Sequence, residues 1–272
     1  MTETDLPNPS STILFFLLTT VCFTFFTMFS ISQAKDYITT ENAINNNIIN
    51  AVYILILIVG SYFINATISK SMCSQSIQWG YILIVTILPW TLIFIFLQFI
   101  LRLFPGWVTP FSNTIGYIII GFLGLQKVYD SIFKSENEDS TNPELTKAIA
   151  NMKSNKMKFI NQISSNLEEF NKFFEGIKST LKDDDNIEVH KLKLYQLLVI
   201  KQALGKIVWY ILAGILISSI SYNLIINMSC EKSLEEIKKD FDTAREEGEQ
   251  AAESQQYEEN ENNAARLRRR RY

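Results

Sequence analysis

The chain has 272 residues with 25 basic and 28 acidic side chains, which gives a net charge of −3. Only seven of these charges lie in the first 126 residues, and this segregation excludes a single soluble globular domain. The three cysteines and the single histidine lack metal-ligand spacing, and no nucleophile or acid/base pair stands near an apolar segment. We therefore expect a non-enzymatic protein with no catalytic, cofactor or metal site.

Five charge-free runs predict helices that cross a membrane. A crossing helix needs about 20 mostly apolar residues. Each of these runs has at least 24 residues, and they cover residues 6–34, 42–69, 71–101, 103–126 and 207–230. The fold class expected is an all-α integral membrane protein with four to five transmembrane helices, in which a polar N-terminus (residues 1–10) precedes a membrane domain (residues 11–134).

The first three spans are expected near residues 13–31, 48–68 and 81–101. No basic region precedes the first one, so it is a retained span rather than a signal peptide. Its threonines Thr20, Thr24 and Thr27 share one helical face, which favours packing against a neighbouring helix over a hydrated pathway. Pro89 removes a backbone donor and predicts a kink in the third span.

A turn rich in proline, glycine and aromatic side chains follows the third span. Turn residues and amphipathic aromatics are favoured in the headgroup layer, so we interpret it as a membrane-interface motif. Its residues are Phe104, Pro105, Gly106, Trp107, Pro110, Phe111, Asn113, Gly116 and Tyr117. Residues 115–133 then predict a fourth span, provided that Lys127 reaches the interface. A re-entrant segment is the alternative.

Residues 114–117, Thr-Ile-Gly-Tyr, partly match the selectivity filter of potassium channels. Ile118 stands where the filter has its second glycine, and Pro110 would disrupt a pore helix before it. A pore centred on residues 104–126 is therefore kept only as an alternative function.

Residues 135–206 form a charged insert with 11 acidic and 11 basic side chains. Pro143 predicts a helix start. Apolar residues then recur at alternating steps of three and four, which is a heptad seam over residues 160–181. The seam consists of Ile160, Ile163, Leu167, Phe170, Phe174, Ile177 and Leu181. We expect a coiled-coil-like helical hairpin, whose seam packs against its own return helix (residues 192–199) or against another copy of the chain.

The last transmembrane helix is expected at residues 207–227, and a charged tail covers residues 228–272. The tail is acidic until it ends in a basic cluster of Arg266, Arg268, Arg269, Arg270 and Arg271. This cluster could bind anionic lipid, nucleic acid or an acidic protein surface. The alternative is a solvated disordered tail.

The stretch FPGWVTPFSNTIGY at residues 104–117 resembles a signature in multi-span proteins of nucleocytoplasmic large DNA viruses, especially phycodnavirus and mimivirus relatives. The resemblance implies a protein of the internal virion membrane, present in host endomembranes during assembly. It also implies that capsid or other virion proteins are its partners, and it supplies no catalytic residue.

The function expected is thus a structural membrane protein that anchors capsid proteins to the virion membrane. A pore and a membrane-curving hairpin protein are the alternatives. The charges near the span ends leave the orientation open. Cys73 and Cys230 could pair only if the two span ends that precede them lie on one side.

Overall fold

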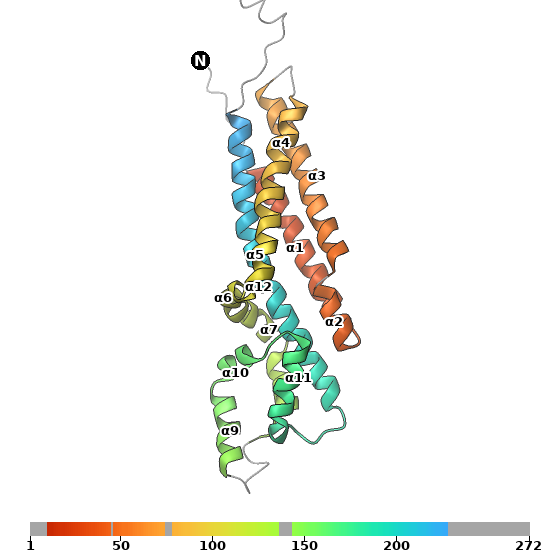
Figure 1. Ribbon diagram of the computed structural model, residues 1–272, viewed down its shortest axis with the longest axis vertical. Helices are drawn as coiled ribbons and strands as arrows, with labels where there is room; N and C mark the ends of the chain where they lie inside the picture. The colour runs from red at the N-terminus through yellow and green to blue at the C-terminus, as the bar shows by residue number, and fades with distance from the viewer. Residues whose placement is uncertain (1–9, 45, 74–77, 136–142, 228–272) are drawn as a thin grey trace, which may run out of the picture.

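The computed structural model describes residues 10–44, 46–73, 78–135 and 143–227. In the described part, the regular secondary structure consists of helices and one isolated antiparallel bridge between Phe133 and Leu181. It is elongated, with an apolar helical bundle at one end and a smaller domain at the other (Figure 1). We call the smaller part the base domain; it comprises residues 125–135 and 143–206.

Four helices of the described chain are long and apolar enough to cross a membrane, and they form the bundle. They are α1 (Ser10–Ser32), α3 (Asn47–Met72), the run of α4 (Trp79–Pro89), η1 (Trp90–Ile95) and α5 (Phe96–Leu103), and α12 (Ile187–Ile226). A short helix α2 (Tyr37–Ile44) precedes α3, and Asn46 caps α3 by accepting hydrogen bonds from the amides of Ile48 and Ile49. The four segments expected from the charge-free runs at residues 13–31, 48–68, 81–101 and 207–227 are therefore present as helices.

Short polar side chains join the helices inside the bundle. The hydroxyls of Thr20 and Tyr53 are 2.9 Å apart, and Asn65 donates to Thr86 at 2.8 Å. Thr20 thus has the packing role expected for the threonine face, whereas Thr24 donates back to the carbonyl of Thr20 in its own helix. Such bonds hold helices together where no water competes for them.

Pro89 changes the helix type, as its missing amide hydrogen predicts. The α-helix ends at Pro89, and the next six residues, Trp90–Ile95, are π-helical before the α-helix resumes at Phe96. Because proline cannot donate to the preceding turn, the chain widens locally and continues as one rod.

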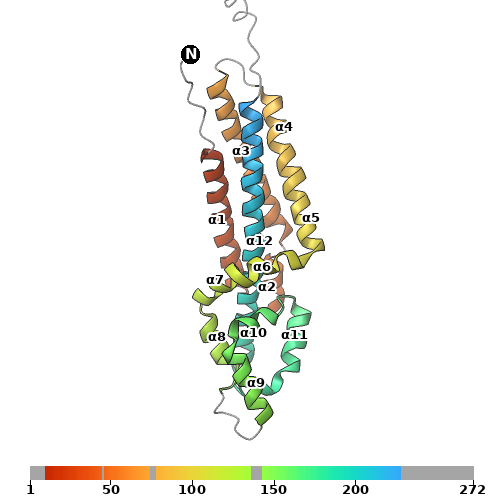
Figure 2. The same cartoon turned by 90° about the vertical axis from the view of Figure 1, so that its left-hand side faces the viewer.

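The straight fourth span expected at residues 115–133 is not formed. The segment is divided into η2 (Pro105–Trp107), α6 (Thr109–Phe111), η3 (Ser112–Gly116) and α7 (Tyr117–Phe122), followed by α8 (Leu125–Ile132). The parts before and after Gly124 meet at 85°. Gly124 adopts a φ of +95°, which glycine tolerates at little cost, so the turn falls there. Figure 2 shows α6 and α7 crossing α12 at the junction between bundle and base domain.

The coiled-coil hairpin is wrong as a continuous structure. The expected seam helix is divided into α10 (Lys156–Gln162) and α11 (Leu167–Gly176), with α9 (Pro143–Ser154) before them and η4 (Lys178–Thr180) after them. Asn166 starts α11 as its N-cap by accepting from the amide of Glu169, which ends the continuity at residues 163–166. The start expected at Pro143 is confirmed.

Candidate functional site

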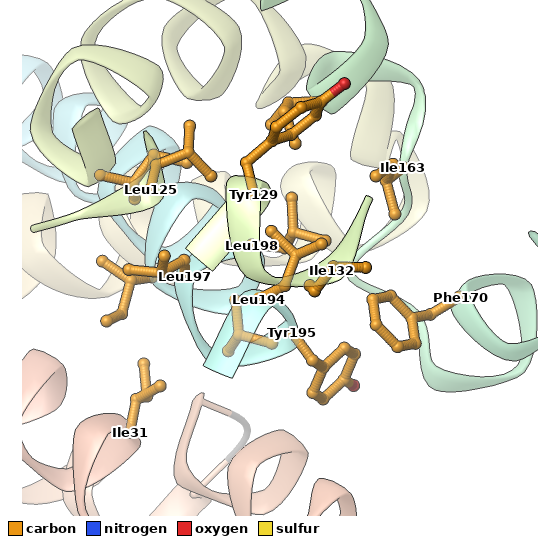
Figure 3. Packing of buried hydrophobic residues seen from close by; sticks show 14 of the residues in the cluster. Ile31, Leu125, Tyr129, Ile132, Ile163, Phe170, Leu194, Tyr195, Leu197 and Leu198 are labelled. Atoms are coloured by element: carbon orange, nitrogen blue, oxygen red, sulfur yellow. The ribbon is translucent and has the colours of Figure 1, made fainter. Parts of the chain in front are cut away.

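All seven seam residues enter one core cluster of the base domain. Phe170 is completely buried, and its ring centroid lies 4.7 Å from that of Phe174 and 5.0 Å from that of Tyr195. Figure 3 shows Phe170 near Tyr195 of α12 and Ile132, and Ile163 belongs to the same cluster. The seam is therefore used within the chain, and the interpretation as a contact with another copy has no free surface to support it.

The aromatic residues of the interface motif gather around Trp209 of α12. Trp107 stacks on Trp209 with ring centroids 6.0 Å apart, and the indole nitrogen of Trp209 donates to the Trp107 carbonyl at 2.8 Å. Phe104 stacks on Trp107 with ring centroids 6.0 Å apart. The ring of Phe111 meets that of Trp209 edge-on, with centroids 5.5 Å apart. Phe104 and Trp107 remain half exposed. Trp209 was missed in the sequence, although its place at the start of a charge-free run was a visible signal.

Beneath these rings the motif crosses α12 in direct backbone contact. A Cβ atom on Gly205 would lie 2.9 Å from both the Val108 carbonyl oxygen and the Ser112 amide nitrogen. A Cβ atom on Gly116 would lie 2.6 Å from the Lys201 carbonyl oxygen. Val108 is completely buried by this contact. Gly116 therefore acts by allowing close approach, and its partner Gly205 could not have been identified without the fold.

A buried lysine ties the motif to the base domain. Lys201 of α12 is only 5% exposed, and its ammonium donates to the side-chain oxygens of Asn113 and Asn161, each at 3.0 Å. Asn161 in turn donates to the Asn113 carbonyl at 3.3 Å. Burial lowers the pKa of Lys201 from 10.5 to about 8. Asn113 of the interface motif thus binds the Lys201 ammonium inside the protein.

Of the remaining motif residues, Pro105 and Gly106 begin the 3₁₀ turn η2, and Pro110 lies within α6. Tyr117 begins α7 and packs against the base-domain cluster.

An amphipathic cavity of about 660 Å³ lies at the end of the bundle nearest the base domain. It is enclosed by α1, the start of α3, the end of α5 and the middle of α12, and its lining contains no acidic side chain. Its polar and charged lining residues are Thr27, Asn46, Asn47, Asn50, Gln98, Arg102, Gln202, Lys206 and Tyr210. The cavity depends on the placement of four distant segments, so sequence analysis missed it.

In the described part of the chain no group of three or more histidine, cysteine, aspartate or glutamate side chains could hold a metal ion. His190, the single histidine, lies 3.8 Å from Asp184 at the partly exposed turn before α12. Cys22 is a free, exposed cysteine, and Cys73 at the end of α3 is disulfide-bonded.

Several expected features lie outside the described residues. They are the polar N-terminus up to residue 9, Cys230, and the charged tail with Arg266, Arg268, Arg269, Arg270 and Arg271.

No protein-family model, no curated protein and no solved structure matches the chain.

Proposed function

We propose that the chain is a non-enzymatic structural membrane protein, which inserts its bundle into a bilayer and holds the base domain at a fixed position beside it. The outer surface of the bundle supports insertion, because large apolar side chains are exposed along it. Examples are Leu14, Phe25 and Phe29 on α1, and Phe63 on α3, each more than 60% exposed. In water such a surface would be an aggregation site, whereas in a bilayer it contacts lipid tails.

The continuity of α12 carries this proposal. Its 40 residues form one helix, about 60 Å long at 1.5 Å per residue. The first half is buried in the base-domain core, and the charge-free second half packs in the bundle against Phe16 and Trp90. A helix without a break resists bending, so a partner held by the base domain is held at a defined distance from the membrane. That is the requirement of an anchor between a membrane and a protein layer.

The resemblance of residues 104–117 to large DNA virus proteins suggests where such an anchor works. We place the protein in the internal virion membrane, and in host endomembranes during assembly, with capsid or other virion proteins bound to the base domain. Cross-linking mass spectrometry of purified particles tests this. Cross-links from the exposed lysines Lys158, Lys172 and Lys178 to a capsid protein are expected. Absence of the chain from the particles would overturn the virion assignment.

We also infer from the arrangement of the helices that both termini lie on the membrane face opposite the base domain. The start of α1 and the end of α12 lie at the same end of the bundle, away from the base domain (Figure 1). In the described residues, Lys35, Arg102 and Lys206 flank the candidate spans at the base-domain end, whereas Lys70 flanks them at the other end. In the sequence, Lys232, Lys238, Lys239 and Arg245 follow the last span closely at that other end, so the positive-inside rule does not assign the base domain to either face of the membrane.

Protease protection tests this orientation in membranes. Tags are placed at both termini and after Asp184, in the exposed turn before α12. We expect both terminal tags on one face and the Asp184 tag on the other. Termini on opposite faces would mean that residues 105–132 cross the bilayer, contrary to the bent geometry.

The bend of 85° is also what a re-entrant pore segment would need, so the pore remains the second candidate. Ion flux through planar bilayers containing the full chain would favour it over the anchor. Gly116→Val is a poor probe of such flux, because its Cβ atom alone would meet the Lys201 carbonyl and displace the whole segment. Tubulation of liposomes without flux would favour the membrane-curving alternative instead.

A further inference from the structure

Two cations line the amphipathic cavity without a counter-charge. Arg102 comes from the end of α5, and Lys206 comes from the turn of α12 that precedes its charge-free half. Within the described residues neither side chain has a hydrogen-bond or ion-pair partner, and the cavity lining holds no carboxylate. Burial lowers the pKa of Lys206, and the neighbouring Arg102 guanidinium lowers it further. Two like charges held together in this way favour an anion between them.

Along two of the helices that form the cavity, one face changes from polar to apolar in the same direction. From α5 to the end of η1 this face passes from Arg102 through Gln98 to Ile95, and on α3 it passes from Asn50 to Ile54. These steps of three and four residues keep the side chains on one helical face. The polar ends, Arg102 and Asn50, lie toward the base domain, and the apolar ends, Ile95 and Ile54, lie one to two turns into the bundle. A ligand that fits this gradient has an anionic head and a hydrocarbon chain.

The cavity is also accessible from the side of the bundle. α3 packs along α4, but α3 and α5 form no comparable contact, so the cavity opens between them. Ile95 and Phe99 line it there and are more than half exposed on the bundle surface. Its volume of about 660 Å³ lies within the range of roughly 300 to 1,000 Å³ that is usual for small-molecule sites.

We propose that this cavity binds one anionic phospholipid, with its phosphate between Arg102 and Lys206 and an acyl chain running between α3 and α5 along Ile54 and Ile95. Basic pockets between membrane helices near the headgroup layer provide the chemistry that such lipids need. The site is separate from the surfaces that carry the anchor function, so either proposal can fail without the other.

Native mass spectrometry and thermal unfolding of the detergent-solubilised full chain test the site. Dioleoyl phosphatidic acid, dioleoyl phosphatidylcholine and inorganic phosphate are the three probes. We expect one phosphatidic acid per chain to remain bound and to raise the melting temperature, and the other two probes to do neither. Equal binding of phosphatidylcholine would overturn the anionic selectivity. Equal stabilisation by inorganic phosphate would overturn the lipid in favour of a soluble anion.

Charge-neutral variants test the two cations. Each charge-assisted hydrogen bond to the phosphate contributes roughly tenfold in affinity, so the double variant Arg102→Gln/Lys206→Gln should bind phosphatidic acid at least tenfold more weakly. The matched control Lys158→Gln/Lys193→Gln removes the same charge from exposed positions outside the cavity, and should bind within twofold of the unchanged chain. Equal binding by the two double variants would refute the site.

A steric variant distinguishes binding inside the cavity from a general effect of the protein's charge on lipid binding. Ala51→Phe places a ring at the cavity wall and keeps both cations. We expect it to weaken phosphatidic acid binding as well. Unchanged binding would mean that the lipid lies elsewhere on the bundle.

Discussion

Gly205→Ala should detach the interface motif from α12. A methyl group at Gly205 would lie 2.7 Å from a methyl carbon of Val108 and 2.9 Å from two backbone atoms of the crossing segment. Real Cβ atoms do not approach backbone this closely, and the backbone atoms cannot be moved aside by a rotamer change. The segment must therefore shift away from the helix.

The expected loss of folding stability follows from one stabilising and two destabilising contributions. Replacing a helical glycine by alanine stabilises an unhindered helix by about 1 kcal/mol. Overpacking costs roughly 1 to 3 kcal/mol. Exposure of Val108 and loss of the Trp209 hydrogen bond add about 2 to 3 kcal/mol if the segment separates fully. Because separation relieves the overpacking, the two costs are alternatives, and the net destabilisation for a segment that separates is about 1 to 2 kcal/mol, opposite in sign to the propensity effect.

Denaturant unfolding in mild detergent, followed by tryptophan fluorescence, measures this loss. Trp107 and Trp209 stack at the junction, so their separation is visible directly. Gly121→Ala is the matched control, because Gly121 lies in α7 of the same segment and a Cβ atom there meets nothing within 4 Å. It should be neutral or slightly stabilising. If the two alanine variants were equally stable, the close crossing over Gly205 would be wrong.

Four further outcomes are expected from single sites. Burial lowers the pKa of Lys201 to about 8, so the unfolded chain binds more protons between about pH 8 and 10.5, and stability should rise with pH across that window. Urea unfolding at each pH should show a smaller rise for Lys201→Met, with the remainder due to Lys206, whose pKa is also lowered. Phe170→Ala, which removes a fully buried ring, should destabilise the base domain by about 3 to 5 kcal/mol, with limited proteolysis beginning there and sparing the bundle. The double-mutant cycle Thr20→Val/Tyr53→Phe should give a coupling of about 0.6 kcal/mol, and zero coupling would contradict the 2.9 Å bond. Maleimide should label Cys22 in unfolded, non-reduced protein, and should label Cys73 only after reduction, since Cys73 is disulfide-bonded.

The candidate spans could be predicted because their signal is local. Each charge-free run indicates a span by itself. α1 and α3 extend only a few residues beyond the expected limits, and α12 ends one residue before the limit expected at 227, although it begins 20 residues before the span expected at 207. The effect of Pro89 was local too, since a missing donor acts on the turn beside it.

The bend at Gly124 and the broken seam are decided by distant contacts. Residues 105–122 lie across α12 because Gly205 leaves room for their backbone and Lys201 contacts Gly116 and Asn113. Both α12 residues come about 90 residues further along the chain. Hydropathy counts apolar residues and does not register this contact, so it favoured a straight span. All seven seam residues belong to one core cluster, four of them buried and three partly buried, but the same spacing arises when two short helices wrap around one core. Periodicity therefore determines which side chains are buried and leaves the continuity of the helix undetermined.

The junction on α12 unites features that were separate in the sequence. Within residues 201–209, Lys201 binds the two asparagines, Gly205 receives the crossing segment, Lys206 lines the cavity and Trp209 closes the aromatic cluster. Lys201, Gly205 and Trp209 are spaced four residues apart, so they share the helical face that meets the crossing segment, and Lys206 lies on the neighbouring face. Before the junction, α12 is buried in the base-domain core, and after it α12 is a charge-free helix of the bundle. The polar residues are concentrated where the surroundings change, and there they fix the height at which the base domain meets the bundle.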